Sequence, residues 1–196
     1  HLGVCRWLVE RGCDPDAGTH DGTRPLHWAV WQGHLPVVGW LVDEAGADLH
    51  ALNSYGCNAI QWAAQSDRTE GLSTCRWLQS RGLNLTLLNR NGHSALHKAA
   101  VKGRTNVCEW LLSPEVGLGA RQLQADGDGN TPSLMARLEG HTALADWLLD
   151  AEQHAGGLAC RGEAVPGAEL HGRDGETEAV SSGCGEQELL GAAEIG

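Results

Sequence analysis

Histidine and cysteine are the side chains of this sequence best suited to chemistry, and the chain has ten histidines and seven cysteines. No histidine belongs to the H-E-x-x-H pattern of a zinc protease, and no C-x-x-C pair occurs. A G-x-S-x-G segment, which would present a serine nucleophile, is absent too. Gly117-Leu-Gly119 and Gly127-Asp-Gly129 lack the further glycine and the preceding strand of a dinucleotide-binding loop. We therefore predict no catalytic residue, no metal site and no cofactor.

Recurrent glycines and tryptophans indicate the elements that position these side chains. Tryptophan returns at intervals of 33, 37, 33 and 37 residues, at Trp7, Trp40, Trp77, Trp110 and Trp147. A turn glycine returns alongside it, at Gly22, Gly56, Gly92 and Gly129. A period in this range is the mark of a repeat architecture. We expect the recurrent tryptophans to lie in the core between repeats, where each could bury about 150–250 Å².

The stretch 89–112 shows one repeat most clearly. The pair Asn91-Gly92 predicts a turn, because glycine tolerates positive φ and asparagine hydrogen-bonds to its own backbone. Ser94 is suited to cap a helix over 95–101, and Gly103 separates that helix from a second one near 105–112. Neither helix carries enough apolar surface to be stable alone, so the unit needs neighbouring repeats.

The turn and first helix resemble the G-x-T-P-L-H-x-A-A signature of ankyrin repeats. The signature is matched by the segments that begin at Gly22, Gly56, Gly92 and Gly129, and the G-H-x-x-V-V pattern of the second helix is matched from Gly33-His34. The resemblance covers about 1–150. It implies an all-α fold, an ankyrin-repeat α-solenoid of helix-turn-helix units joined by β-turn or hairpin loops. His27 and His97 stand at the signature histidine, where the resemblance implies a structural hydrogen bond.

The pattern divides the chain into six segments. Because His1 aligns with the histidine of the second-helix signature, we expect the chain to start inside a repeat, with residues missing before it. The segments are the second helix and exit loop of a truncated repeat at 1–18, repeats at 19–52, 53–88 and 89–125, a divergent closing repeat at 126–152, and a Gly-rich acidic tail at 153–196.

Two connections are longer than elsewhere, and the tail has a different composition. The inter-helix segment Gln65–Leu72 carries three extra residues, which fit either a tolerated surface insertion or a binding loop. The exit segment Ser113–Gln124 is lengthened as well. Residues 154–196 contain no aromatic side chain and are rich in glycine and glutamate, so they cannot bury enough apolar area to offset the entropy of ordering. We expect this tail to be disordered.

Charge and cysteine usage restrict the class of partner and the compartment. A net charge of −11 opposes binding to nucleic acid or to anionic lipid. No apolar run approaches the length of a membrane span. Cys5, Cys75 and Cys108 each precede a recurrent tryptophan by two residues, which predicts buried free thiols rather than disulfides. We expect an intracellular, most simply cytoplasmic, monomer.

In ankyrin repeats the turn tips and the exposed side of the first helices form a concave binding face. Transferred to this sequence by position, that face predicts partner contacts from all four repeats. Trp31 and Tyr55 are the expected main contacts, because aromatic side chains bring large area for little entropy. The predicted set is His20, Asp21, Thr23, Trp31, Gln32, Ser54, Tyr55, Gln65, Ser66, Arg90, Asn91, His93, Val101, Lys102, Asp128, Asn130, Leu138 and Glu139.

The sequence thus favours a non-enzymatic scaffold or adaptor that binds a protein partner through this face. The alternative is the recognition arm of a larger enzyme, an acyltransferase, a kinase or a ubiquitin-ligase adaptor, whose catalytic part lies outside these residues. Fold alone does not separate the two. The sequence does not identify the partner.

Overall fold

The computed structural model describes residues 1–159, apart from the side chains at 119–120 and 156–159, and residues 1–157 form one compact unit. All regular structure in this part of the chain is helical. In chain order the elements are α1 (Leu2–Glu10), α2 (Pro25–Trp31), α3 (Leu35–Asp43), α4 (Ala59–Ala64), α5 (Gly71–Ser80), α6 (Ala95–Val101), α7 (Thr105–Leu111), the 3-10 helix η1 (Gly119–Leu123), α8 (Pro132–Leu138) and α9 (Thr142–Ala159).

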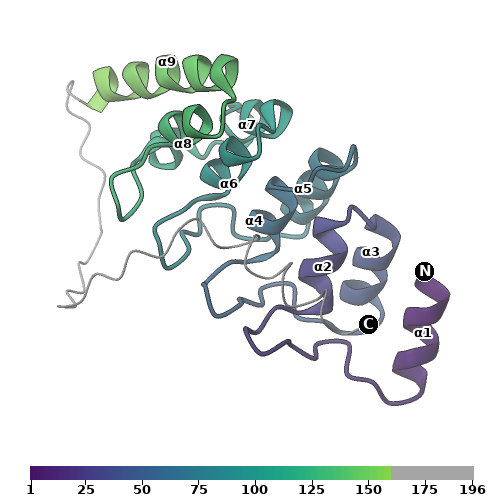
Figure 1. Ribbon diagram of the computed structural model, residues 1–196. Coiled ribbons are helices and arrows are strands. Elements are labelled where there is room, and N and C mark those ends of the chain that lie inside the picture. The colour runs from purple at the N-terminus through teal and green to yellow at the C-terminus, as the bar shows by residue number, and fades with distance from the viewer. Residues whose placement is uncertain (160–196) are drawn as a thin grey trace. The chain divides into compact units, whose positions relative to one another are not determined.

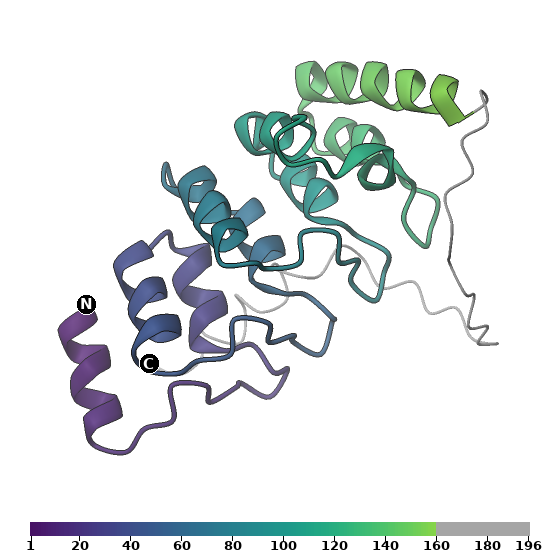
Figure 2. The same cartoon turned by 180° about the vertical axis from the view of Figure 1, so that it is seen from behind.

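The helices stack in pairs, and the pairs follow one another in chain order (Figure 1). Within the pairs, α2 contacts α3, α4 contacts α5 and α6 contacts α7. Between pairs, the first helices form a row in which α2 contacts α4, α4 contacts α6 and α6 contacts α8. The loops that lead into the first helices all project to the same side, which the opposite view also shows (Figure 2). The predicted all-α solenoid of helix-turn-helix units is confirmed.

Local sequence fixes where the first helices α2, α6 and α8 begin. Pro25 and Pro132 open α2 and α8, where the missing N–H would have had no helical partner. Ser94 caps α6 as predicted, because its Oγ accepts a hydrogen bond from the backbone N–H of His97 at 3.3 Å. Thr131 caps α8 in the same way through Leu134 N, at 3.4 Å. These caps allow helices of two turns to start at defined residues.

The core is built from the same repeat positions each time. Leu26, Ile60 and Leu96 occupy the signature leucine position and are fully buried. The fourth repeat has Ser133 there, a polar group that needs partners once it is buried. Glu152 of α9 supplies them, because its Oε1 accepts from Ser133 N at 2.9 Å and its Oε2 from Ser133 Oγ at 2.6 Å. The divergent repeat therefore adds a polar contact to the apolar packing of Leu144 and Leu148 of α9, which are buried.

The prediction that all recurrent tryptophans lie in the core is wrong for part of the set. Trp40 and Trp110 are buried, with 7% and 5% of their surface exposed, whereas Trp7 is 51% and Trp147 39% exposed. The reason is position, since α1 and α9 are the first and last helices described and each has a repeat on one side only. Trp77 is half-buried, and the Arg81 guanidinium lies 4.7 Å from its ring centroid.

The predicted boundary between the closing repeat and the tail, at residue 152, is not the end of a helix. Helix α9 continues to Ala159. Two contacts accompany the extension: Glu152 binds α8, and His154 Nδ1 lies 2.7 Å from the Asp150 carbonyl oxygen one turn earlier. The tail predicted to be disordered is left with residues 160–196, which lie outside the described residues.

Candidate functional site

The candidate partner-binding face begins with the turns, which backbone hydrogen bonds join in series. Ser54 N donates to Asp21 O at 2.7 Å, and Arg90 N donates to Tyr55 O at 2.9 Å. Gly127 N donates to Asn91 O at 3.0 Å and so links the third turn to the fourth. A side chain at a turn tip is therefore held at a fixed distance from the tips on either side.

A buried polar side chain closes each of the last three turns from within. In the second turn Asn53 Oδ1 accepts from the N–H groups of Tyr55 and Cys57, at 3.1 and 2.9 Å. Asn89 does the same for the third turn and Asp126 for the fourth. The turn-closing role of these residues was not predicted from the sequence. The recurrence of Asn or Asp three residues before the turn glycine could have indicated it.

The turn-tip residues predicted to contact a partner divide by exposure. His20, Ser54, Arg90, Asn91 and Asp128 are exposed. Asp21, Tyr55 and Asn130 are partly exposed. The tips therefore present side chains of different charge and size at equivalent positions, above a framework of turn-closing residues that is nearly the same in each repeat.

Four predicted contact residues are buried, and this corrects the set. Thr23 donates its hydroxyl to Asp21 Oδ2 at 2.6 Å, inside the first turn. Ser66 donates to the Trp31 carbonyl oxygen at 2.6 Å, and Gln65 lies buried beside it in the chain. His93 is buried against Asp126. Because neighbouring repeats cover these side chains, a partner cannot reach them without rearranging the fold.

Trp31 is also less available than the sequence suggested. It belongs to an aromatic cluster with Trp28 of its own helix and Trp62 of α4, and the ring centroids lie 5.7 to 6.4 Å apart. Trp62 is buried, while Trp28 and Trp31 are partly exposed. At these spacings the rings fill the space between α2 and α4 and leave no room for a ligand group between them. Trp31 therefore contributes to the contact between repeats as well as to the candidate face.

The first helices of the third and fourth repeats supply the remaining predicted contacts. Val101 and Lys102 end α6 and are partly exposed. Leu138, at the equivalent end of α8, has 73% of its surface exposed, and Glu139 beside it is exposed as well. Among the side chains that the structure describes, Leu138 is the most exposed large apolar one, and it stays a predicted partner contact.

The signature histidines have the structural role that the resemblance implied. His27 Nδ1 accepts from Arg24 N at 3.0 Å, and its Nε2 donates to the Ala51 carbonyl oxygen at 3.2 Å. His97 Nδ1 accepts from Ser94 N at 3.2 Å. Burial lowers the pKa of His27, and burial together with the charge of His93 lowers the pKa of His97 to about 4. Both imidazoles are therefore neutral near pH 7.

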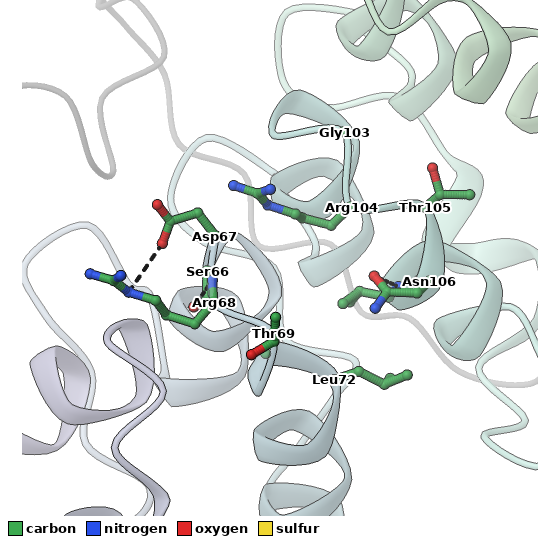
Figure 3. Close-up of a pocket in the computed structure, with 11 residues that line it drawn as sticks. Ser66, Asp67, Arg68, Thr69, Leu72, Gly103, Arg104, Thr105 and Asn106 are labelled. Atoms are coloured by element: carbon green, nitrogen blue, oxygen red, sulfur yellow. Dashed lines mark hydrogen bonds and ion pairs between the residues drawn. The ribbon is translucent and has the colours of Figure 1, made fainter.

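A hollow of about 380 Å³ lies between the second and third repeats (Figure 3). Its walls are the inter-helix segment 66–72 of the second repeat and the turn 103–107 of the third. In residues 1–159 no three histidine, cysteine or acidic side chains gather closely enough to hold a metal ion. No helix in that range combines the length and apolar character needed to cross a membrane.

The sequence pattern that describes ankyrin repeats in three copies matches residues 1–78 and again residues 60–157. The chain belongs to the ankyrin-repeat family. Ankyrin repeats are protein-interaction modules, so family membership agrees with a face built from turn tips and first helices. The two overlapping matches also cover the divergent fourth repeat and α9, where the signature is weakest.

Characterised relatives of this ankyrin-repeat protein include larger proteins of several kinds. Protein fem-1 homolog A-like of Mus musculus is 30% identical over 179 residues, which are 91% of this chain and 25% of the relative. Tyrosine-protein kinase Shark of Drosophila melanogaster is 27% identical, over 86% of this chain and 18% of the relative. Palmitoyltransferase ZDHHC17 of Danio rerio is 27% identical, over 79% of this chain and 30% of the relative. The chain thus spans less than a third of the length of each.

Proposed function

We propose that this ankyrin-repeat chain is a non-enzymatic scaffold or adaptor module. It binds a protein partner through a face formed by the turn tips and by the exposed ends of the first helices. The observation that carries the proposal is the separation of two kinds of residue. Framework residues such as Asn53 and Asn89 are buried and repeat their role, whereas His20, Ser54 and Arg90 are exposed and chemically different at equivalent positions.

Such an arrangement suits recognition, because variable side chains on a rigid scaffold lose little entropy on binding. Leu138 adds apolar area at the fourth repeat, and Trp31 and Tyr55 add aromatic area at the first and second. The proposed contact set is the predicted one without Thr23, Gln65, Ser66 and His93, whose side chains are buried.

An intracellular site of action is part of the same proposal. Cys75 and Cys108 are buried free thiols, and burial raises the pKa of each to about 12. Thiols of this kind are typical of proteins that work in reducing compartments.

The proposal is tested by affinity capture from the source cell with the 196-residue chain. A double variant, Arg90→Glu with Leu138→Asp, changes the charge and the apolar area of the face. Arg76→Glu is the matched control, since Arg76 is exposed on α5 and outside the predicted contact set. We expect the control to retain the captured protein and the double variant to lose it. Equal recovery by both variants would refute the assignment of the face.

A second candidate is favoured by the relatives: the chain is the recognition arm of a multidomain enzyme. A tyrosine kinase and a palmitoyltransferase are among the proteins it resembles, and it spans only part of each. The full-length transcript tests this candidate directly. A catalytic domain in the same reading frame would support it, and a reading frame that holds ankyrin repeats alone would exclude it.

A further inference from the structure

The hollow beside α5 and α7 contains side chains that could bind an anion. Most of its polar lining consists of cationic, hydroxyl and amide side chains: Ser66, Arg68, Thr69, Arg104, Thr105 and Asn106. They come from two repeats, and the three extra residues of the second repeat make up part of one wall. The extra residues thus border a hollow, which favours the binding-loop interpretation of the insertion.

Arg104 is the side chain that points to a ligand. Its Nε atom is buried and has no hydrogen-bond partner in the part of the chain that the structure describes. The guanidinium also makes no ion pair there, unlike those of Arg6 and Arg24, which bind Glu44 and Asp16. Buried donors are normally paired. Figure 3 shows the Arg104 side chain extending from its turn toward Asp67 and Arg68 of the opposite wall.

Arg68 is held at the rim of the hollow by two neighbours. Its Nη2 donates to Gln32 Oε1 at 2.8 Å, and its Nε lies 3.4 Å from Asp67 Oδ1 (Figure 3). Its side chain is still half exposed. Asp67 is the acidic residue of the lining and is paired with Arg68, and the neighbouring Glu70 carboxylate accepts from Thr69 at 2.9 Å. Arg104 is therefore the lining cation that has no ion pair within residues 1–159. A guanidinium held by neighbours loses less entropy when it binds an anion.

The third repeat as a whole is basic in an acidic chain. Stretch 89–112 contains Arg90, Lys98, Lys102 and Arg104 against Glu109 alone, while the full chain has a net charge of −11. The overall charge repels extended polyanions such as nucleic acid, but a compact anionic group meets a local excess of cations. Arg90 is exposed at the tip of the third turn, and the partly exposed Lys102 and Arg104 follow the other end of α6, whereas Lys98 is buried.

We propose that the hollow receives an anionic side chain of the protein partner, a carboxylate or a phosphoryl group, with Arg104 and Arg68 as its cationic ligands. The proposal rests on the proposed function and specifies the chemistry of the partner: an acidic or phosphorylated segment that crosses the third repeat. A guanidinium forms charge-assisted, often bidentate hydrogen bonds with both groups. Thr105 and Asn106 supply neutral donors to the remaining anionic oxygens.

The test uses short fluorescein-labelled peptides and the 196-residue chain, with binding followed by fluorescence anisotropy. One peptide has a central run of glutamates, one has glutamines in their place, and one has a central phosphoserine. We expect the glutamate or the phosphoserine peptide to bind and the glutamine peptide not to. Which anionic peptide binds identifies the group. Affinity should fall as salt is added, because the site is open to solvent.

Two variants test the residues, and circular dichroism verifies that each is folded. Arg104→Gln should weaken binding by about tenfold or more, since it removes charged hydrogen bonds. Arg68→Gln should weaken binding as well. It replaces Arg104→Gln as the test variant if Arg104→Gln fails to fold. Arg76→Gln, away from the hollow, should leave binding unchanged. The proposal is overturned if neither anionic peptide binds at millimolar concentration, or if Arg104→Gln and Arg68→Gln both bind as tightly as Arg76→Gln. If the anion site is refuted in this way, the chain can still capture its partner through the proposed face. Failure of the anion site is therefore distinguishable from failure of the proposed function.

Discussion

His93 Nε2 donates a hydrogen bond to Asp126 Oδ2 over 2.9 Å and so joins the turn of the third repeat to the turn of the fourth. The side chain of Asp126 is completely buried, and the His93 ring stacks on that of His97, with 5.6 Å between centroids. Burial opposes ionisation of Asp126, yet hydrogen bonds from Asn130, Asp128 and His93 hold its pKa below the usual value. The contact between these two repeats is therefore polar and titratable.

Acidification should weaken the fold through the buried imidazoles. Burial lowers the pKa of His27, His93 and His97, and that of His97 falls from 6.5 to about 4. Between pH 6.5 and about pH 4, His97 binds a proton in the unfolded chain but not in the folded chain. The free energy of unfolding therefore decreases as the pH falls through this range. For His97 alone the loss is on the order of 3 kcal/mol.

The variant His97→Gln tests this pH dependence, because Gln61 fills the same position in the second repeat. Gln61 Nε2 donates to the carbonyl oxygens of Leu87 and His93, at 3.1 and 2.8 Å. We expect His97→Gln to reduce the difference between urea unfolding near neutral pH and at about pH 5. An unchanged difference would mean that another group controls the acid sensitivity.

Asp126 should be replaceable by asparagine but not by alanine. Asparagine closes the second and third turns at the equivalent positions, Asn53 and Asn89. Asp126→Ala removes acceptors for two backbone N–H groups and for His93, which predicts a loss of about 2–3 kcal/mol, whereas Asp126→Asn should cost roughly 1 kcal/mol or less. Chemical denaturation measures both values. Equal losses would show that the side-chain hydrogen bonds contribute little.

Gly103 should be the least tolerant of the inter-helix glycines. Its φ is 65°, and a Cβ atom there would lie 2.6 Å from the His141 ring. Gly140 has φ 83° and open space around it. Gly140→Ala therefore introduces only the backbone strain, about 1 kcal/mol, without a steric clash. We expect Gly103→Ala to lower the melting temperature further than Gly140→Ala. Similar shifts would mean that His141 moves aside without cost.

The recurrent tryptophans should contribute unequally to stability. Trp110 is 5% exposed and lies between repeats, whereas Trp7 at the equivalent position is 51% exposed. Truncation of a buried tryptophan to alanine typically costs about 3–5 kcal/mol. We therefore expect Trp110→Ala to lower the free energy of unfolding by about that much and Trp7→Ala by clearly less. The two variants can be compared in one denaturation series.

The repeat architecture was predictable because its signals are local. The turn glycines, the Ser94 cap and the buried Leu26, Ile60 and Leu96 follow from residue type and spacing, and the structure confirms them. The exposure of Trp7 and Trp147 was not predictable from spacing, because it depends on whether another repeat covers the helix. The hydrogen bond between Ser133 and Glu152 was not predicted either. It joins residues that are far apart in sequence.

For the candidate site, exposure was predictable at some positions and not at others, and the site itself stays a prediction. Position within the repeat predicts exposed side chains at Ser54, Arg90 and Leu138, and all three are exposed. It does not show that Ser66 bonds back to Trp31. It also does not show that Trp31 packs on Trp28 and Trp62, or that the extra residues near Arg68 enclose a hollow. Contacts between repeats decide these features, and a single repeat does not encode them.

Site-specific photo-cross-linking tests whether a protein partner binds at the turn tips and the exposed ends of the first helices. A benzophenone side chain is placed at Ser54 or Leu138 on the proposed face, or at Arg76 on α5, in the 196-residue chain expressed in the source cell. We expect Ser54 and Leu138 to cross-link to the same protein and Arg76 not to. Cross-linking from Arg76 without cross-linking from either face position would contradict it.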